Sequence, residues 1–286
     1  MNGKALYRLT KPGVTYGNLI TALAGYLFAA GGSIDWATFG ALAIGTWGII
    51  ASACVINNYL DQDIDAVMAR TKKRPLLTGE VTPRQALVFG ALLGVGGTIL
   101  LAMFTNYLVV GIGVIGWITY VWLYGALSKR KSVHGTLVGA VSGAAPILAG
   151  YVAARGSIDI GAVLVFAALF FWQMPEFYSI AIYRKKEYAA ARIPLISIVK
   201  SVDTTIRHIF VHTLAFSVSV LLLPVFGYTS TSYAAIMGLG CLYWMYLAFQ
   251  GLSTNKPEAW AKRMFRFSMV LLLVFSLLIS IDIFLP

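Results

Sequence analysis

The sequence predicts an all-α, polytopic membrane protein with about nine transmembrane helices. Of its 286 residues, 59% are apolar and 12% are charged, and the mean hydropathy of +0.79 is far above that of ordinary soluble domains. Apolar stretches recur at roughly the 20 residues that a helix needs to cross a bilayer. Because no linker or low-complexity segment interrupts this pattern, we expect residues 1–286 to form a single transmembrane domain.

The expected spans are apolar segments separated by polar connections. They cover residues 14–32, 36–57, 83–104, 107–127, 135–154, 160–182, 206–226, 233–252 and 264–285. Cys54 and Cys241 lie inside such segments, so we expect them to pack in the interior and not to form a disulfide framework or a metal site.

The cations of the chain predict its orientation, because short loops rich in Lys and Arg stay cytoplasmic. Of the 22 Lys and Arg residues, only Arg155 falls on the opposite side once these spans are drawn. The amino end is therefore predicted to be cytoplasmic and the carboxyl end periplasmic, in a bacterial inner membrane. Topology and anionic lipid explain the net charge of +11, so we expect no nucleic-acid partner.

The first long connection begins with three oxygen-bearing side chains at helical spacing. Asn57, Asp61 and Asp65 are four residues apart, so each lies about 40° further around a helix and all three share one stripe. Asp63 points about 200° away from Asp61, toward solvent or a loop cation. The three residues of the stripe can therefore converge on one ligand, and Asp63 is excluded from it.

Hard oxygen ligands of this kind favour Mg²⁺, which is usually held by one or two carboxylates together with phosphate oxygens. Cations follow within a few turns, and their side chains suit phosphate recognition. They are Arg70, Lys72, Lys73 and Arg74. The sequence therefore predicts a Mg²⁺-diphosphate site, and the alternative is a solvated loop whose charges neutralise one another.

The second long connection, residues 183–205, emerges on the same face as the first, so the two could close over one site. We expect Pro175 to interrupt the sixth span and to leave Glu176 near membrane depth. Intramembrane acids mainly face a cavity or a partner, so Glu176 is a site candidate. The alternative is that it has reached the aqueous interface. Glu187 of the second connection could complete the Mg²⁺-diphosphate site.

Three segments of the chain resemble the protohaem IX farnesyltransferases, or haem O synthases, a branch of the UbiA superfamily of intramembrane prenyltransferases. They are NNYLDQDIDAVMARTKKRP (57–75), YVWLYGALSKRKSVHGTLVGAVSGAAP (120–146) and WQMPEFYSIAIYRKKEYAAARIP (172–194). The NxxxDxxxD spacing is typical of the whole superfamily, whereas SKRxSVxGTLxGxxSGAxP and WQMP are typical of the haem branch. The likeness extends over nearly the whole chain and includes the helix count.

The resemblance implies transfer of a farnesyl group from farnesyl diphosphate to a vinyl carbon of haem B, which gives haem O. It implies that Asn57, Asp61 and Asp65 hold Mg²⁺ and diphosphate in a UbiA-type bundle. Association with haem-copper oxidase assembly or haem A synthesis is a further expectation. The remaining positions that match the family's site are Arg70, Arg74, Lys129, Arg130, Glu187 and Tyr188.

One departure concerns Glu176, because members of the family commonly have histidine there. Other candidates for contact with haem are His208 and His212, spaced i, i+4, although polar residues near a helix end more often make interfacial hydrogen bonds. Gly135, Gly139 and Gly143 form a small-residue stripe that permits close helix packing and leaves room for a flat macrocycle. Aromatic side chains that could stabilise an allylic cation are Tyr120, Trp122, Tyr124, Phe171 and Trp172.

Two other functions stay open at this point. A UbiA-type enzyme with an aromatic, quinone-precursor acceptor would share the first motif, but the segment 128–146 argues against it. An ion-coupled transporter could place Asp61, Asp65 and Glu176 in a cavity, yet transport has no special use for a cation-flanked diphosphate cage on one face.

Overall fold

The computed structural model describes residues 3–286, and its regular elements in that range are all helices. In chain order they are α1 (Gly3–Leu9), α2 (Pro12–Ala30), α3 (Trp36–Leu60), α4 (Gln62–Val67), α5 (Pro83–Phe104), α6 (Tyr107–Ile118), the π-helical η1 (Thr119–Ser128), α7 (Lys129–Lys131), α8 (Gly135–Arg155), α9 (Ile160–Tyr183), α10 (Lys185–Ala190), α11 (Ile196–Val199), α12 (Val202–Val225), α13 (Thr231–Gly251), α14 (Pro257–Ile281) and the short 3₁₀ turn η2 (Asp282–Phe284).

Eight helices in the described range are long and apolar enough to cross a membrane, which makes the chain a polytopic membrane protein. The segment expected as the first span also forms a helix, α2, but it is not one of these eight. It carries Asn18 and Thr21, and both line an internal cavity. Polar residues on a membrane helix usually face such an interior. These residues explain why α2 is less apolar in sequence than the eight other long helices.

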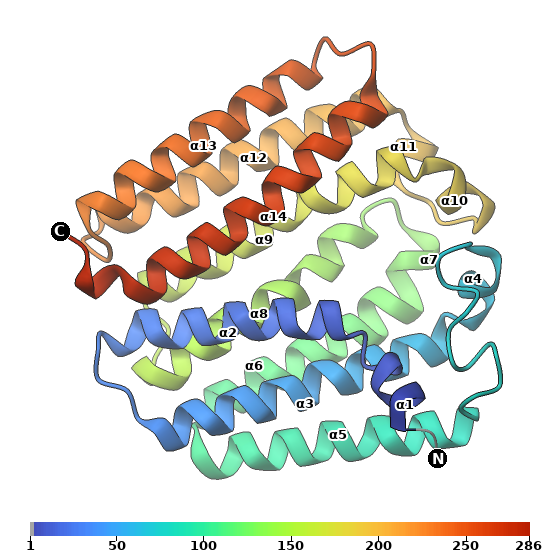
Figure 1. Ribbon diagram of the computed structural model, residues 1–286, viewed down its shortest axis with the longest axis horizontal. Helices are drawn as coiled ribbons and strands as arrows, with labels where there is room; N and C mark the ends of the chain where they lie inside the picture. The colour runs from blue at the N-terminus through green and yellow to red at the C-terminus, as the bar shows by residue number, and fades with distance from the viewer. Residues whose placement is uncertain (1–2) are drawn as a thin grey trace.

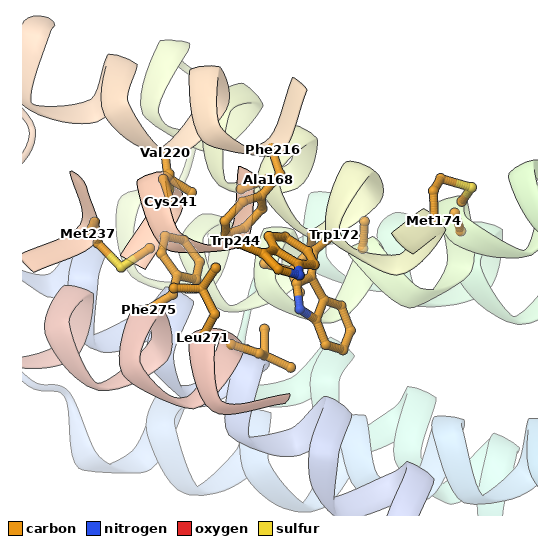
Figure 2. Close-up of a cluster of buried hydrophobic side chains, with 14 of the residues drawn as sticks. Ala168, Trp172, Met174, Phe216, Val220, Met237, Cys241, Trp244, Leu271 and Phe275 are labelled. Atoms are coloured by element: carbon orange, nitrogen blue, oxygen red, sulfur yellow. The ribbon is translucent and has the colours of Figure 1, made fainter. Parts of the chain in front are cut away.

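The long helices pack side by side into two connected groups (Figure 1). Helix α3 packs along α5, and α2 packs along α8. Helices α9, α12, α13 and α14 form the second group, and contacts of α8 with α9 and of α2 with α14 join the groups. The second group surrounds an aromatic core, in which the rings of Phe216 and Trp244 meet edge to face at 5.3 Å (Figure 2).

Glycines allow the closest helix contacts in the first group. A Cβ built on Gly150 of α8 would lie 1.8 Å from the carbonyl oxygen of Ala22 on α2, and one on Gly97 of α5 would lie 2.6 Å from that of Gly45 on α3. Such backbone-to-backbone approach is typical of helix pairs in membranes, where packing replaces the hydrophobic driving force.

Capping side chains begin several of the helices. Thr82 and Gln85 form a reciprocal capping box at the start of α5, and the Asp159 carboxylate accepts from the Ala162 N–H at the start of α9. These side chains satisfy amides that have no partner within their own helix.

Two local features differ from expectation. The predicted interruption at Pro175 is wrong, because α9 runs without a break from Ile160 to Tyr183 with the proline inside it. Membrane helices tolerate proline where neighbouring groups can satisfy the freed carbonyl. The second feature is η1, where the Lys129 N–H donates to the Tyr124 carbonyl, one residue further back than in an α-helix.

The short helices gather at one end of the bundle. Figure 1 shows α1, α4, α7, α10 and α11 at this end, whereas the C-terminus lies at the opposite end of the long helices. The two long connections thus emerge together, as their spacing predicts.

Candidate active site

The stripe of three oxygen-bearing side chains continues through the end of α3. The Asp61 N–H donates to the Asn57 carbonyl at 3.0 Å, and the Asp65 N–H donates to the Asp61 carbonyl at 2.8 Å, so helical spacing persists into α4. The three residues are only 2%, 1% and 4% exposed, respectively. The sequence therefore positions three polar groups on one buried line.

Each member of the stripe contacts a cation from a different part of the chain. Lys11 Nζ donates to Asn57 Oδ1, and Arg74 donates to Asp65 Oδ2. Lys129 Nζ lies 2.5 Å from Asp61 Oδ2. Buried carboxylates are costly unless paired, so these cations stabilise the stripe when no substrate is bound.

Lys11 is a residue that the sequence reasoning did not assign to the site. It precedes α2 with a left-handed φ of 50°, and burial lowers the pKa of its ammonium group to about 8. The only signal in the sequence was that Lys11 directly precedes Pro12, shortly before the first expected span. Nothing in the sequence showed that α2 begins beside the end of α3.

Asp63 lies outside the stripe, as its angular position predicts. Its carboxylate accepts from both terminal nitrogens of Arg130, at 2.6 and 2.7 Å, and its side chain is 65% exposed. The hydrogen bond from Arg130 lowers the pKa of Asp63 to about 2. Arg130 also donates to the Leu60 carbonyl and lies 3.7 Å from Asp61 Oδ1, so it clamps the turn between α3 and α4.

The two long connections meet over the stripe. Ile64 and Met68 from the first pack against Ile193 from the second, with Tyr188 at the edge of this cluster. Glu187 accepts from Arg184 at 3.1 Å through Oε1. Its Oε2 is buried without a hydrogen-bond partner among the described residues.

Arg70 and Lys73 do not join the buried contacts. Both are exposed, and the carbonyl of Lys73 accepts from Arg8 of α1 at 2.8 Å. Burial raises the pKa of the Tyr188 hydroxyl, and the charge of Arg70 opposes that rise, so Arg70 lies within electrostatic reach of the second loop. Of the cations predicted for diphosphate, Arg74, Lys129 and Arg130 make direct contacts with the first loop's acids.

A cavity of about 410 Å³ adjoins the stripe between the two groups of helices. Lys129 and Tyr188 belong to its lining, and Lys129 also pairs with Asp61, so the polar stripe and the cavity share a wall. Most of the remaining lining is apolar or glycine. The cavity can therefore hold an apolar molecule whose charged end reaches the stripe.

The predicted glycine stripe packs closely and also borders this cavity. A Cβ built on Gly139 would lie 3.1 Å from the Tyr124 ring, and one on Gly143 would lie 1.9 Å from Gln173 Oε1. The Gln173 Nε2 group donates to the Ala140 carbonyl at 3.1 Å, which fixes the register of α8 against α9.

The structure separates the predicted aromatic residues. Tyr120, Tyr124 and Trp172 line the cavity. Trp122 is 58% exposed on the outer surface, and Phe171 packs against Phe170 and His212, so the prediction is wrong for these two. Helical spacing could not decide this for Trp122, because η1 changes which of its side chains face inward, and Phe171 is placed by the packing of α9 against α12. The sequence reasoning also did not select Trp117, another lining residue.

His208 and His212 lie away from the cavity. Their rings each stand 6.0 Å from the ring of Tyr178, and His212 Nδ1 is 2.7 Å from the His208 carbonyl. Neither residue is among the described residues that line the cavity, so this placement gives no support to the expected contact with haem. Glu176, in contrast, lines the cavity and is half-buried.

The residues of the stripe fit a hard divalent cation. In residues 3–286 no cluster of three or more His, Cys, Asp or Glu side chains is positioned to form an all-protein metal cage. Two carboxylates and one amide remain, and Asp61 Oδ1 is buried without a hydrogen bond to any described group. This donor set suits Mg²⁺, which typically takes its other ligands from water and substrate phosphate.

Known proteins resemble the chain in sequence and in structure. Protoheme IX farnesyltransferase of Photorhabdus laumondii is 39% identical, over 99% of this chain and 96% of the relative. That of Yersinia enterocolitica is 40% identical over the same shares.

Among solved structures, a digeranylgeranylglyceryl phosphate synthase superimposes with a TM-score of 0.84 at 18% identity, covering 98% of both chains. A UbiA homologue of Archaeoglobus fulgidus bound to GPP and Mg²⁺ gives 0.74 at 14% identity, covering 96% of this chain and 99% of that one. These two likenesses concern the fold. The UbiA prenyltransferase family model matches residues 18–272, and with the sequence relatives it establishes that the chain belongs to the UbiA prenyltransferase family.

Proposed function

We propose that this protein transfers the farnesyl group of farnesyl diphosphate to a vinyl carbon of haem B, giving haem O and diphosphate. The observation that carries the proposal is the buried stripe of Asn57, Asp61 and Asp65, which meets an apolar cavity among lipid-depth helices. The names and extent of the sequence relatives support haem as the acceptor.

At the polar end, Asn57, Asp61 and Asp65 would hold Mg²⁺ together with the diphosphate. The metal ion, when bound, supplies positive charge where the leaving group becomes negative. Arg74 and Lys129 already touch the stripe, and they are positioned to bind diphosphate oxygens when substrate arrives. Heterolysis of the C–O bond is then favoured by charges that are in place beforehand.

At the apolar end, the farnesyl chain would lie in the cavity and gain about 0.8 kcal/mol for each buried CH₂. The faces of Tyr120 and Tyr124 can stabilise positive charge on its first carbon through their ring quadrupoles. Glycines of α8 on the same wall leave space for the flat macrocycle of the acceptor.

We further propose that the cation-rich end faces the cytoplasm of a bacterial inner membrane. The placement of nearly all Lys and Arg residues on one side supports this orientation. The diphosphate would then enter and leave on the cytoplasmic side, with the C-terminus in the periplasm.

The decisive experiment incubates the purified protein in lipid with haem B, Mg²⁺ and farnesyl diphosphate, and measures product masses. The expected product is haem carrying a hydroxyethylfarnesyl group, formed only when the divalent cation is present. Prenylation of an aromatic quinone precursor under conditions where haem is left unchanged would instead assign the aromatic-acceptor reaction. Translocation of an ion without any prenylated product would assign transport.

A further inference from the structure

Glu176 is the only acidic residue in the lining of the cavity within the described part of the chain. Its side chain makes no hydrogen bond or ion pair with any residue from 3 to 286, whereas the side chains of Asp61 and Asp65 each contact a cation. A half-buried carboxyl facing an apolar cavity is costly to maintain without a partner, so it is a candidate for a functional role.

The register of the helices places Glu176 near the stripe's end of the cavity. Gln173 contacts α8 at Ala140, and Glu176 follows one helical turn further along α9, toward the loop that carries Tyr188. On the facing wall, Tyr124 packs over Gly139, and its neighbour Gly125 lies close to Asn57. Glu176 and the diphosphate site thus border the same part of the cavity.

The chemistry of the proposed function, on which this inference rests, needs a proton acceptor at this place. The terminal vinyl carbon of haem bonds to farnesyl C1 while the C–O bond breaks, and that bond's electron pair leaves with diphosphate. Positive charge then resides on the inner former vinyl carbon. The oxygen of a water molecule bonds to it, and the resulting protonated alcohol must release one proton to give the hydroxyl group.

We propose that Glu176 is the catalytic residue that orients this water and accepts its proton. With the vinyl group in this part of the cavity, the Glu176 carboxylate would also favour the cation electrostatically before water attacks. General bases within hydrogen-bond reach of the transferred proton typically contribute about 10²- to 10⁴-fold in rate.

The other polar groups of the cavity are less suited to this step. Lys129 is paired with Asp61 and is a cation. The lining tyrosines, Tyr120, Tyr124 and Tyr188, carry phenol groups, which are weak proton acceptors. Asp61 and Asp65 are committed to cations and to the diphosphate end. Glu176 alone combines a carboxyl group, access to the cavity and freedom from a partner among the described residues.

The test compares products of the wild type with those of Glu176→Gln, which keeps shape and removes the base. We expect formation of hydroxylated product to fall about 10²-fold, with an increased share of an alkene that is lighter by one water. This alkene forms when the cation loses a proton from the adjacent CH₂. Haem affinity, followed by its absorption spectrum, is expected to stay within about 3-fold, because a neutral amide fills the same space.

Two further variants make the test specific. Glu176→His supplies another proton acceptor and is expected to restore the wild-type product ratio. Glu258→Gln removes an exposed carboxylate at the start of α14 and is expected to change nothing. If Glu176→His fails to accumulate in membranes, Glu176→Asp, which keeps the carboxylate, takes its place and carries the same expectation.

The outcomes separate this inference from the function it deepens. A wild type that forms no farnesylated haem would overturn the proposed function itself. A wild type that forms hydroxylated haem, with Glu176→Gln giving the same rate and product ratio, would overturn only the role of Glu176. Loss of haem affinity in Glu176→Gln without any change in product ratio would also overturn it, because Glu176 would then be a haem-binding group.

Discussion

The acids of the stripe and the acid of the cavity wall are held in opposite ways. Asp61 and Asp65 are almost fully buried, and each contacts a cation from a distant part of the chain. Glu176 is half-buried and has no such contact with the described residues. The stripe can therefore release its cations to an incoming anion such as diphosphate. The Glu176 carboxyl group has no partner to release within the described chain and stays available to a neutral or cationic reactant.

The largest expected effect tests the first half of this comparison. Asp61→Asn or Asp65→Asn should reduce turnover by at least about 10³-fold, because metal-binding charge is lost where the leaving group develops its own. Packing is conserved, so the variants should still insert into membranes and bind haem. The rate of product formation measures the turnover, and the amount of each variant in the membrane fraction measures its insertion. Normal activity in both variants would contradict the assignment of the stripe.

A smaller effect is expected when the stripe loses a cation. Lys129→Ala removes the group 2.5 Å from Asp61 Oδ2. Hydrogen bonds to charged groups contribute about 1.5–3 kcal/mol, so kcat/KM for farnesyl diphosphate should fall about 10- to 100-fold. Lys131→Ala is the matched control, since this neighbour is exposed. Equal losses in the two variants would mean that local charge density, and not the contact with Asp61, sets the affinity.

The wall that carries Glu176 can be disturbed without altering any charge. Gly143→Ala would place a methyl group 1.9 Å from Gln173 Oε1 and displace this amide, which donates to the Ala140 carbonyl of α8. Overpacking of this kind costs about 1–3 kcal/mol, so the thermal midpoint in detergent should fall. Gly96→Ala on α5 is the control, because nothing lies within 4 Å of its added methyl group. An unchanged midpoint in Gly143→Ala would show that the Gln173 side chain moves aside without loss of stability.

The smallest effect is expected at Asp63, and it tests whether this residue lies outside the site. Asp63→Asn removes the charge and one of the two oxygens that accept from Arg130 at 2.6 and 2.7 Å, but this side chain is mostly exposed. Exposed ion pairs contribute about 0.2–1 kcal/mol, so activity should change less than about 5-fold. Steady-state rates of Asp63→Asn and Asp61→Asn, measured side by side, give the difference between the two losses of activity. A loss as large as that of Asp61→Asn would place Asp63 in the site.

Much of the fold follows from the sequence because its signals are local. Apolar length predicts the long helices, and the spacing of Asn57, Asp61 and Asp65 predicts their shared line whether or not the helix bends after Leu60. The expected closure of two loops also holds, since both follow spans that end on one side.

The parts that sequence reasoning missed depend on tertiary packing. Lys11 joins the site only because α2 starts beside the end of α3. Trp122 and Phe171 were candidates for stabilising an allylic cation because of their type, but the helices turn them outward or against other side chains. Pro175 was expected to interrupt a helix, and α9 instead continues through it.

The π-helical segment Thr119–Ser128 determines which side chains of this helix face the lipid and which face the interior. Each of its turns takes up about one residue more than an α-helical turn, so every later side chain is rotated relative to a regular helix. That added rotation brings Lys129 to Asp61 while Tyr124 still faces inward. Deleting a single residue here would rotate the ammonium group by about 100° around the helix and take it away from Asp61.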